Sequence, residues 1–346
     1  MAENNLALYR KYRPTAFAEG IGQEAVVKTL EGAIKQGNIA HAYLFAGSRG
    51  TGKTSVARIF AKEIGCSAND LYEIDGASNR GIDEIRELRE AVRVSAFDSP
   101  YKVYIIDEVH MLTKDAFNAL LKTLEEPPSH VIFVLATTEL HKVLDTIISR
   151  CQTLTFQTPA VDNLKIFLER VAKGEEIKIE EEAVELLALL ADGSFRDAAG
   201  KLQQVLAATP GCHEVSLAEV ETVTGAPAAL LVNRFIAAIL NQDLSVGLGT
   251  IEALGKNNGD MRIFVKLILK RLRLILLTRL VPELAATMAA GLTAEAREQI
   301  GQWSKHARAQ ILPSVLTGLL AVYDEIGRSY LPQLPLELYL IKNTSS

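Results

Sequence analysis

The eight residues from Gly47 to Thr54 restrict the fold of this chain more than any other stretch of its sequence. They read Gly-Ser-Arg-Gly-Thr-Gly-Lys-Thr and follow a short apolar run, Ala42 to Ala46. The pattern G-x-x-x-x-G-K-[ST] is typical of a loop whose glycines let backbone N–H groups converge on a phosphate at the positive end of the next helix. Apolar residues at helical spacing continue to Ile64, so the pattern lies between an expected strand and an expected helix. A chance glycine-rich turn, the alternative, leaves this context unexplained.

The side chains of this loop suit a nucleotide with its magnesium ion. Lys53 would reach the β- and γ-phosphates, and the Thr54 hydroxyl would lie on Mg²⁺. The loop residues expected to bind the nucleotide are Gly47, Arg49, Gly50, Thr51, Gly52, Lys53, Thr54 and Ser55. The sequence therefore predicts a phosphate-binding loop.

The composition is that of an ordinary globular protein. The 346 residues correspond to about two or three domains, and 48% of them are hydrophobic and 23% charged. The net charge of −5 does not indicate a nucleic-acid-binding protein, although local patches on an acidic chain can still hold phosphates. The start lacks an apolar signal core, and the most apolar region, 261–280, carries six Lys or Arg residues, too many for a membrane span. Three cysteines without framework spacing, Cys66, Cys151 and Cys212, suit a reducing cytoplasm.

Strands and helices are expected to alternate in the first half of the chain. Short apolar runs predict strands, and apolar residues at helical spacing predict helices. After 42–46 the expected strands are 71–75, 103–106, 131–135 and 153–157, and the expected helices are 23–36, 55–64, 82–94, 114–124 and 141–149. This order predicts an α/β domain with a parallel sheet covered on both faces.

Beyond Pro159 the strand signals disappear. Three helices are expected at 161–173, 180–191 and 195–208, and the chain is expected to stay helical to its end. The region 261–280 is apolar around most of a helical circumference, which predicts a helix buried in a bundle or against other subunits. The expected domains are a nucleotide-binding core at 1–159, a three-helix domain at 160–224 and a helical domain at 225–346.

Polar residues end two of the expected strands. Asp107 and Glu108 follow the strand at 103–106, at the carboxyl edge where a parallel sheet presents ligands. Asp107 can hold Mg²⁺ through water, and Glu108 can orient or deprotonate an attacking water. Two solvated acids would be the alternative for an isolated pair, but this pair follows a phosphate loop. Thr137 or Thr138, with Thr138 preferred, could bond the γ-phosphate or the attacking water, but threonine is also common in strands without any such role.

Two arginines lie at helix ends. Arg150 stands just past an expected helix, where a cation that satisfies the helix dipole is a frequent and sufficient explanation. Arg196 lies in the first turn of a helix that Ser194 would cap, with Asp197 at the third position. Because the dipole disfavours a cation there, Arg196 indicates a nearby anion such as a γ-phosphate.

Several motifs in order resemble one protein family. They are Arg10-Lys11-Tyr12-Arg13-Pro14, Ile21-Gly22-Gln23-Glu24, DEVHMLTKDAFNALLKTLEEPP from Asp107, Ser149-Arg150-Cys151, and Gly193 to Ala198. The chain resembles the bacterial DNA polymerase III gamma/tau family, the ATPases of the sliding-clamp loader. The likeness is close over residues 6–205 and weaker beyond them.

The resemblance implies an AAA+ ATPase with a P-loop sheet core, a three-helix lid and an all-α collar that assembles a ring-like pentamer with other clamp-loader subunits. ATP and Mg²⁺ would be held by the loop, with Thr54 and Asp107 at the metal. Arg150 would complete the site of a neighbouring subunit in trans, as an arginine finger. The remaining residues that the resemblance places at the nucleotide are Glu108, Thr138 and Arg196 at the γ-phosphate and Arg13, Pro14, Ile21 and Gly22 near the adenine.

The implied function is ATP-driven loading of the sliding clamp onto primer-template DNA. The implied location is the cytoplasm, without membrane contact. The chain would work within the DNA-directed DNA polymerase III holoenzyme, a nucleotidyltransferase complex. The family usually inserts a four-cysteine zinc module after the loop-following helix, whereas only Cys66 stands here, so no zinc is expected. The resemblance implies the short gamma form, which is expected to end after the collar. Candidate DNA contacts are Asn79-Arg80, Thr113-Lys114 and His141-Lys142, and His110 is expected to pack or hydrogen-bond.

Three other functions are alternatives. A hexameric branch-migration helicase would carry a winged-helix domain where this chain continues into an apolar helical region. A non-hydrolysing scaffold subunit of the loader would have lost loop or Asp-Glu residues, which this chain keeps. A small-molecule kinase would leave Arg150 and Arg196 unexplained.

Overall fold

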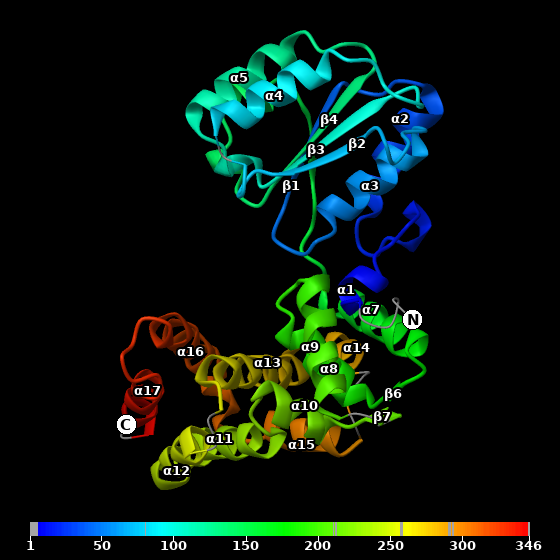
Figure 1. The fold of residues 1–346 in the computed structure, drawn as a ribbon. Helices are drawn as coiled ribbons and strands as arrows, with labels where there is room; N and C mark the ends of the chain where they lie inside the picture. Colours follow the sequence, from blue (N-terminus) through cyan, green and yellow to red (C-terminus); the bar gives the residue numbers. More distant parts are fainter. Residues whose placement is uncertain are drawn as a thin grey trace. The chain divides into compact units, whose positions relative to one another are not determined.

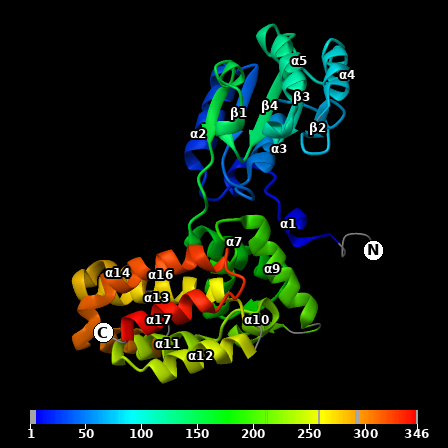
Figure 2. The ribbon, with the colours of Figure 1, turned by 90° about the vertical axis from the view of Figure 1, so that its left-hand side faces the viewer.

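The computed structural model describes residues 6–79, 81–209, 211, 213–256, 259–289, 292 and 294–344, so Arg80 and Cys212 lie outside the described residues. The chain divides into two compact units (Figures 1 and 2). The first unit comprises residues 1–171 and 191–200, and the second comprises residues 172–190 and 201–346.

A parallel sheet forms the centre of the first unit. Among the described residues it has five strands: β1 (Ala42–Ala46), β2 (Leu71–Asp75), β3 (Lys102–Asp107), β4 (Val131–Thr137) and β5 (Gln152–Thr155). They run in the order β2-β3-β4-β1-β5, and every neighbouring pair is parallel. All residues of β1 and β4 are buried, which agrees with the apolar sequences of 42–46 and 131–136.

Helices cover both faces of this sheet, because successive side chains of a strand point to opposite faces. Tyr43 and Phe45 of β1 pack in the same cluster as the buried residues of α2 (Glu24–Gln36) and α3 (Lys53–Glu63). Leu44 packs instead in the cluster that contains the buried residues of α4 (Ile82–Val92) and α5 (Lys114–Glu125). Figure 1 shows α4 and α5 on one side of the sheet and α2 and α3 on the other. The α/β prediction is confirmed.

The remaining elements of the first unit are short or continue beyond it. They are α1 (Leu8–Lys11), η2 (Phe17–Glu19), η3 (Val109–Met111), η4 (Leu140–Lys142), α6 (Asp145–Ile148), most of α7 (Val161–Gly174) and the start of α9 (Phe195–Ala208). The prediction of one helix over 141–149 is wrong, since η4 and α6 are separate. Val143 and Ile147 are both buried four residues apart, which mimics a helical pattern, but the backbone at Val143 and Leu144 is extended.

The second unit is built around α13 (Met261–Leu280), whose residues Phe264, Ile268 and Leu272 are fully buried. Trp303 packs against the same core. The other helices of this unit are α8 (Glu181–Leu190), α10 (Leu217–Thr224), α11 (Ala229–Asn241), α12 (Leu244–Lys256), α14 (Pro282–Met288), α15 (Ala294–Ser304), η5 (Ala307–Ile311), α16 (Leu312–Ile326) and α17 (Leu334–Thr344). The prediction that 261–280 forms a helix buried in a bundle is confirmed.

Two very short strands correct the expectation that none follows Pro159. β6 (Lys178–Ile179) and β7 (Glu214–Val215) pair in parallel in the second unit. Two residues are too few to produce the alternation from which a strand is predicted.

In the part of the chain that the structure describes, no helix on its own has the length and apolar character needed to cross a membrane. α10 and α11 together meet those two criteria, but they are bent by 84° relative to each other.

Candidate functional site

A cavity of about 1010 Å³ lies in the first unit, where β1, β2 and β3 end. Its lining includes Tyr9, Arg10, Arg13, Pro14, Ile21, Arg49, Gly50, Gly52, Lys53, Thr54, Ser55, Arg58, Glu73, Asp75, Asp107, Glu108, Phe167, Arg170, Phe195 and Arg196. Of the predicted site residues, all of which are described, the ones outside this lining are Gly22, Gly47, Thr51, Thr138 and Arg150.

The loop after β1 turns tightly before α3 begins at Lys53, two residues earlier than expected. Gly50 and Gly52 have φ angles of 75° and 100°, in the left-handed region that favours glycine. A Cβ at Gly47 would lie 2.6 Å from the carbonyl oxygen of Phe156, so the close approach of that backbone requires glycine. The buried Thr51 donates its hydroxyl to the carbonyl oxygen of Ser48 at 3.0 Å. The loop is therefore fixed by its own backbone and by the sheet edge.

Lys53 points back across this loop. Its Nζ donates to the carbonyl oxygens of Gly47 and Ser48, at 2.7 and 2.9 Å. Burial lowers the pKa of Lys53 below its ordinary value, and the carboxylates of Glu108 and Asp107 oppose this effect. A phosphate at this place would favour the charged amine further.

Thr54 and Asp107 bring two hard oxygen ligands together. The Thr54 hydroxyl donates to Asp107 Oδ2 at 2.8 Å, and the backbone N–H of Glu108 donates to Asp107 Oδ1 at 2.9 Å. Mg²⁺ prefers such oxygen ligands and keeps several waters, so the pair fits a magnesium ion. Within the described residues no three His, Cys, Asp or Glu side chains are grouped to hold a metal. The expected absence of zinc stays a prediction.

Glu108 is held beside the end of β4. Its backbone is left-handed, with φ and ψ both 46°, which is uncommon for a residue with a Cβ. Glu108 Oε2 accepts from the Thr138 hydroxyl at 2.9 Å and from the Thr138 backbone N–H at 3.3 Å. Thr138 thus reaches the cavity through Glu108 rather than by lining it.

Several arginines, among them Arg13, Arg58 and Arg196, line the same cavity. Burial lowers the pKa of Arg13, and the nearby Arg58 lowers it further. The Arg196 guanidinium lies 4.8 Å from the centre of the Tyr9 ring, and hydrogen bonds from Arg196 and Arg10 lower the pKa of Tyr9. An anion is the natural complement of this cluster.

The start of α9 packs directly on the phosphate loop. The backbone N–H of Phe195 donates to the Gly50 carbonyl oxygen at 3.0 Å, and the Asp197 N–H donates to Ser194 Oγ at 3.2 Å. Ser194 therefore caps α9, as the sequence predicts. This contact carries Arg196 to the cavity edge.

Gly22 and Arg150 have other surroundings. Gly22 has a φ of 72° and approaches Asn163 so closely that a Cβ would lie 2.3 Å from its amide nitrogen. Arg150 donates to the Thr146 carbonyl oxygen at 2.7 Å and pairs with Glu125 at 2.6 Å, and its side chain is 34% exposed. The nucleotide roles assigned to these residues, like those of the lining residues, stay predictions.

Sequence reasoning missed several residues at this cavity. Arg58 lies one turn after Thr54 on α3, so the four-residue spacing was an available signal. Its guanidinium pairs with Glu73 at 2.5 Å. Tyr9 and Arg170 carried no local signal, because only the folded chain brings them to the loop.

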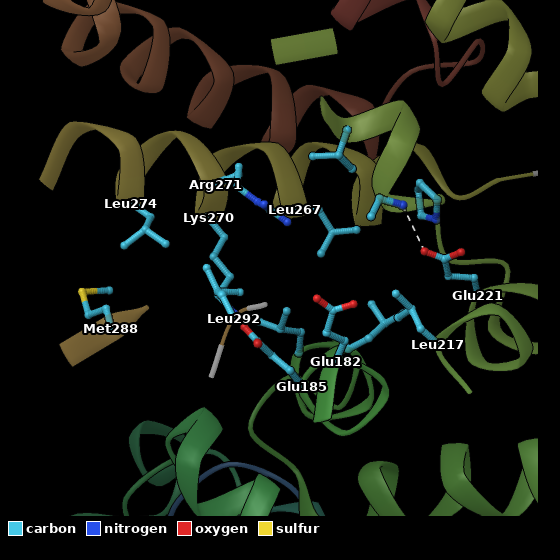
Figure 3. A pocket seen from close by; sticks show the side chains of 15 residues that line it. Glu182, Glu185, Leu217, Glu221, Leu267, Lys270, Arg271, Leu274, Met288 and Leu292 are labelled. Atoms are coloured by element: carbon cyan, nitrogen blue, oxygen red, sulfur yellow. Dashed lines mark hydrogen bonds and ion pairs between the residues drawn. The ribbon is translucent and has the colours of Figure 1, made fainter. Parts of the chain in front are cut away.

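A second cavity, of about 120 Å³, lies in the second unit (Figure 3). Burial lowers the pKa of Arg271, whose buried Nη1 has no hydrogen-bond partner among the described residues, and burial raises the pKa of Glu221. The dashed line in Figure 3 is the bond from the Ala229 N–H to Glu221, at 3.0 Å. None of the predicted site residues lines this cavity.

Two family models match the chain. One, described as the DNA polymerase III delta subunit, matches residues 22–81 and 69–160. The other, described as the ATPase lid domain of the DNA polymerase III clamp loader subunit, matches residues 164–211. Together they cover both the phosphate loop and the helix that carries Arg196.

Named relatives are similar over most of the chain. DNA polymerase III subunit tau of Bacillus subtilis is 37% identical over 97% of this chain and 62% of its own length. DNA polymerase III subunit gamma/tau of Mycobacterium bovis is 37% identical over 81% of this chain and 52% of its own length. The chain thus spans between half and two thirds of these two relatives.

Among solved structures, the RuvB Holliday junction branch migration motor of Thermotoga maritima matches with a TM-score of 0.52 and 24% identity, over 72% of this chain and 86% of that one. This likeness supports the fold alone. The sequence relatives and the lid model agree with the motifs that begin at Arg10, and the chain belongs to the DNA polymerase III gamma/tau subunit family.

Proposed function

We propose that this chain is an ATP-hydrolysing motor subunit of a DNA polymerase III clamp loader, which loads the sliding clamp onto primed DNA. The observation that carries the proposal is the convergence of Lys53, Thr54 and Asp107 on one cavity at the carboxyl edge of a parallel sheet. Glu108 lines the same cavity, so a group that can accept a proton lies beside the phosphate site.

Each of these side chains has a chemical task in the proposal. Lys53 exchanges its two carbonyl acceptors for the β- and γ-phosphates of ATP. Thr54 and Asp107 hold Mg²⁺, which neutralises charge on the phosphate oxygens when bound. Glu108 takes the proton of the attacking water, and Thr138 fixes its carboxylate.

The two arginines act from different directions. Arg196 reaches the γ-phosphate of its own chain from the start of α9, and it lines the cavity. Arg150 does not line it and is partly exposed, so we assign it to the nucleotide of a neighbouring subunit. To reach that phosphate it must exchange Glu125 for a more highly charged anion. An arginine supplied in trans raises the rate about 10³–10⁵-fold in other NTPases.

The proposed setting is a cytoplasmic, ring-like pentamer with other clamp-loader subunits, the sliding clamp and primer-template DNA as partners. The proposed divisions of the chain are a core at 1–159, a lid at 160–224 and a collar at 225–346. The match of the lid model to residues 164–211 supports the second of these. Nucleotidyl transfer would belong to the holoenzyme and not to this chain.

The test measures ATP hydrolysis by the assembled loader with clamp and primed DNA. Lys53→Ala is expected to abolish hydrolysis, because the phosphates lose their amine. Arg150→Ala is expected to bind ATP normally and to hydrolyse it about 10³–10⁵-fold more slowly. Glu125→Ala, the matched control, removes the carboxylate that pairs with Arg150 within the chain but keeps Arg150 itself, and it should hydrolyse ATP at nearly the wild-type rate.

The outcomes separate the activity from the trans-acting role. A wild-type complex without Lys53-dependent hydrolysis would show that the proposed activity is wrong. If Arg150→Ala hydrolyses as fast as wild type, or if Glu125→Ala loses as much activity as Arg150→Ala, the role of Arg150 at a neighbouring site is wrong.

A further inference from the structure

His110 is a nearly buried histidine beside the proposed catalytic carboxylate. It lies in η3, two residues after Glu108, and its side chain is 5% exposed. Its Nδ1 lies 3.0 Å from Thr137 Oγ1 and 3.4 Å from Glu108 Oε2. Its Nε2 lies 3.4 Å from Glu139 Oε1. Both ring nitrogens therefore face oxygen atoms, as buried polar groups require.

Glu108 Oε2 is the point on which these contacts converge. Thr138 holds this oxygen with its hydroxyl and its backbone N–H. The His110 ring approaches the same oxygen. Because the carboxylate is still 29% exposed, it would otherwise have room for other rotamers.

Glu139 anchors the far side of the ring. Its carboxylate accepts from Lys142 Nζ at 2.8 Å, and this hydrogen bond is the main cause that lowers the pKa of Glu139. Its backbone N–H donates to Thr137 Oγ1 at 3.0 Å, the hydroxyl that also contacts His110. The ring is thus held at both nitrogens by residues at the end of β4.

We infer that His110 is a positioning residue for ATP hydrolysis, which keeps the Glu108 carboxylate against Thr138 and is itself held by Glu139. The inference rests on the proposed function, in which Glu108 is the general base. A base must lie within hydrogen-bond reach of the water whose proton it takes. A displacement of about 1 Å can lower a rate about a hundredfold. Loss of the ring therefore lowers the turnover rate and leaves ATP binding unchanged.

Two variants of His110 test its contacts at Nδ1 and at Nε2 separately. His110→Asn keeps a polar atom near the place of Nδ1 and loses the contact with Glu139, whereas His110→Ala loses both. In the assembled loader with clamp and primed DNA, His110→Ala is expected to lower kcat about 10–100-fold, with KM for ATP within about twofold of wild type. His110→Asn should lie between His110→Ala and wild type.

The matched control is His130→Ala. His130 also bonds through its ring, but to the Val94 carbonyl oxygen at 3.2 Å rather than to residues beside the proposed catalytic carboxylate. Its replacement should leave kcat at the wild-type value. Equal losses in His130→Ala and His110→Ala would overturn the inference.

A double-variant cycle separates positioning from a structural role. In the Glu108→Gln background, His110→Ala should cause no further loss, because residues that act as a unit are not additive. The inference is overturned if the same loss recurs in that background, if His110→Ala turns over as fast as wild type, or if both His110 variants lose ATP binding. Failure of the proposed function is a different result, namely a wild-type complex without Lys53-dependent hydrolysis.

Discussion

Alanine at Gly50 is expected to damage the contact between the phosphate loop and α9, whereas alanine at Gly52 is expected to strain the loop alone. Both glycines have left-handed backbones, with φ of 75° and 100°. A Cβ in that conformation costs about 1–2 kcal/mol. At Gly50 this Cβ would also lie 2.0 Å from Ser194 Oγ and 2.9 Å from Ser194 Cβ, while at Gly52 it would meet no neighbouring atom of the described residues within 4 Å.

The expected free-energy cost of Gly50→Ala follows from the hydrogen bonds that it would break. Moving Ser194 away would break the bond from Phe195 N–H to Gly50 O and the cap bond from Asp197 N–H, at 3.0 and 3.2 Å. Each such bond contributes about 0.5–1.5 kcal/mol net. Gly50→Ala should therefore cost about 2–5 kcal/mol locally and Gly52→Ala about 1–2 kcal/mol. The two lost bonds account for a difference of about 1–3 kcal/mol, which corresponds to about a 5–150-fold change in local opening.

Hydrogen exchange at the Phe195 amide is the suitable measurement. The sole tryptophan, Trp303, lies in the second unit, so its fluorescence does not report on the loop. The Phe195 amide should exchange about 5–150-fold faster in Gly50→Ala than in Gly52→Ala. In a Ser194→Gly background, Gly50→Ala should cost only the about 1–2 kcal/mol of the left-handed backbone, because the side chain with which the Cβ collides is gone. Equal exchange in the two alanine variants, or an undiminished effect in the Ser194→Gly background, would refute the steric reasoning.

Three further predictions concern single side chains. Thr54→Val removes the hydroxyl that bonds Asp107, so ATP affinity should lose most of its dependence on Mg²⁺. Titrations of ATP at varied magnesium concentrations measure this, and an unchanged dependence would contradict the metal assignment. Burial would raise the pKa of Asp70, but hydrogen bonds that its carboxylate accepts, the strongest of them from Ser99, hold this pKa well below its usual range. The ionised Asp70 therefore stabilises the fold above the unfolded-state pKa of about 4, and this stabilisation is lost as the pH falls below it. In urea unfolding, Asp70→Asn should be less stable than wild type at pH 7, and the difference in unfolding free energy should shrink in acid. Burial raises the pKa of Cys151 to about 12, so at pH 8 its thiol should react with iodoacetamide at least about tenfold more slowly in the folded than in the unfolded chain, as mass spectrometry would measure.

The fold class was predictable from the sequence, but the arrangement of the sheet was not. Apolar runs such as 103–106 and 131–135 predict buried strands, and their alternation with helices predicts a parallel sheet. Strands that are apolar on both faces carry no alternation that could reveal their register or neighbours. The order β2-β3-β4-β1-β5 and the pairing of Ala42 with Phe133 therefore appear only in the structure.

The candidate site was predictable where its residues are local in sequence. Lys53 and Thr54 belong to one spaced pattern, and Asp107 and Glu108 end one strand, so local rules point to them. Tyr9 comes to the cavity only through tertiary packing. His110 was expected to pack or hydrogen-bond, and its ring lies within hydrogen-bond distance of Thr137. Its proximity to both Glu108 and Glu139 depends on the pairing of β3 with β4.

The place of β1 in the sheet has a consequence for synthesis of the chain. β1 is wholly buried, yet its partners are distant in sequence, with Ala42 opposite Phe133 and Tyr43 opposite Gln152. At about 5–20 residues per second, a ribosome needs roughly 5–20 s to make the intervening hundred or so residues. During that interval neither of the strands that hydrogen-bond to β1 exists, so both edges of β1 are unpaired. Holding chaperones that mask residues 42–46 would therefore act mainly before translation reaches β4.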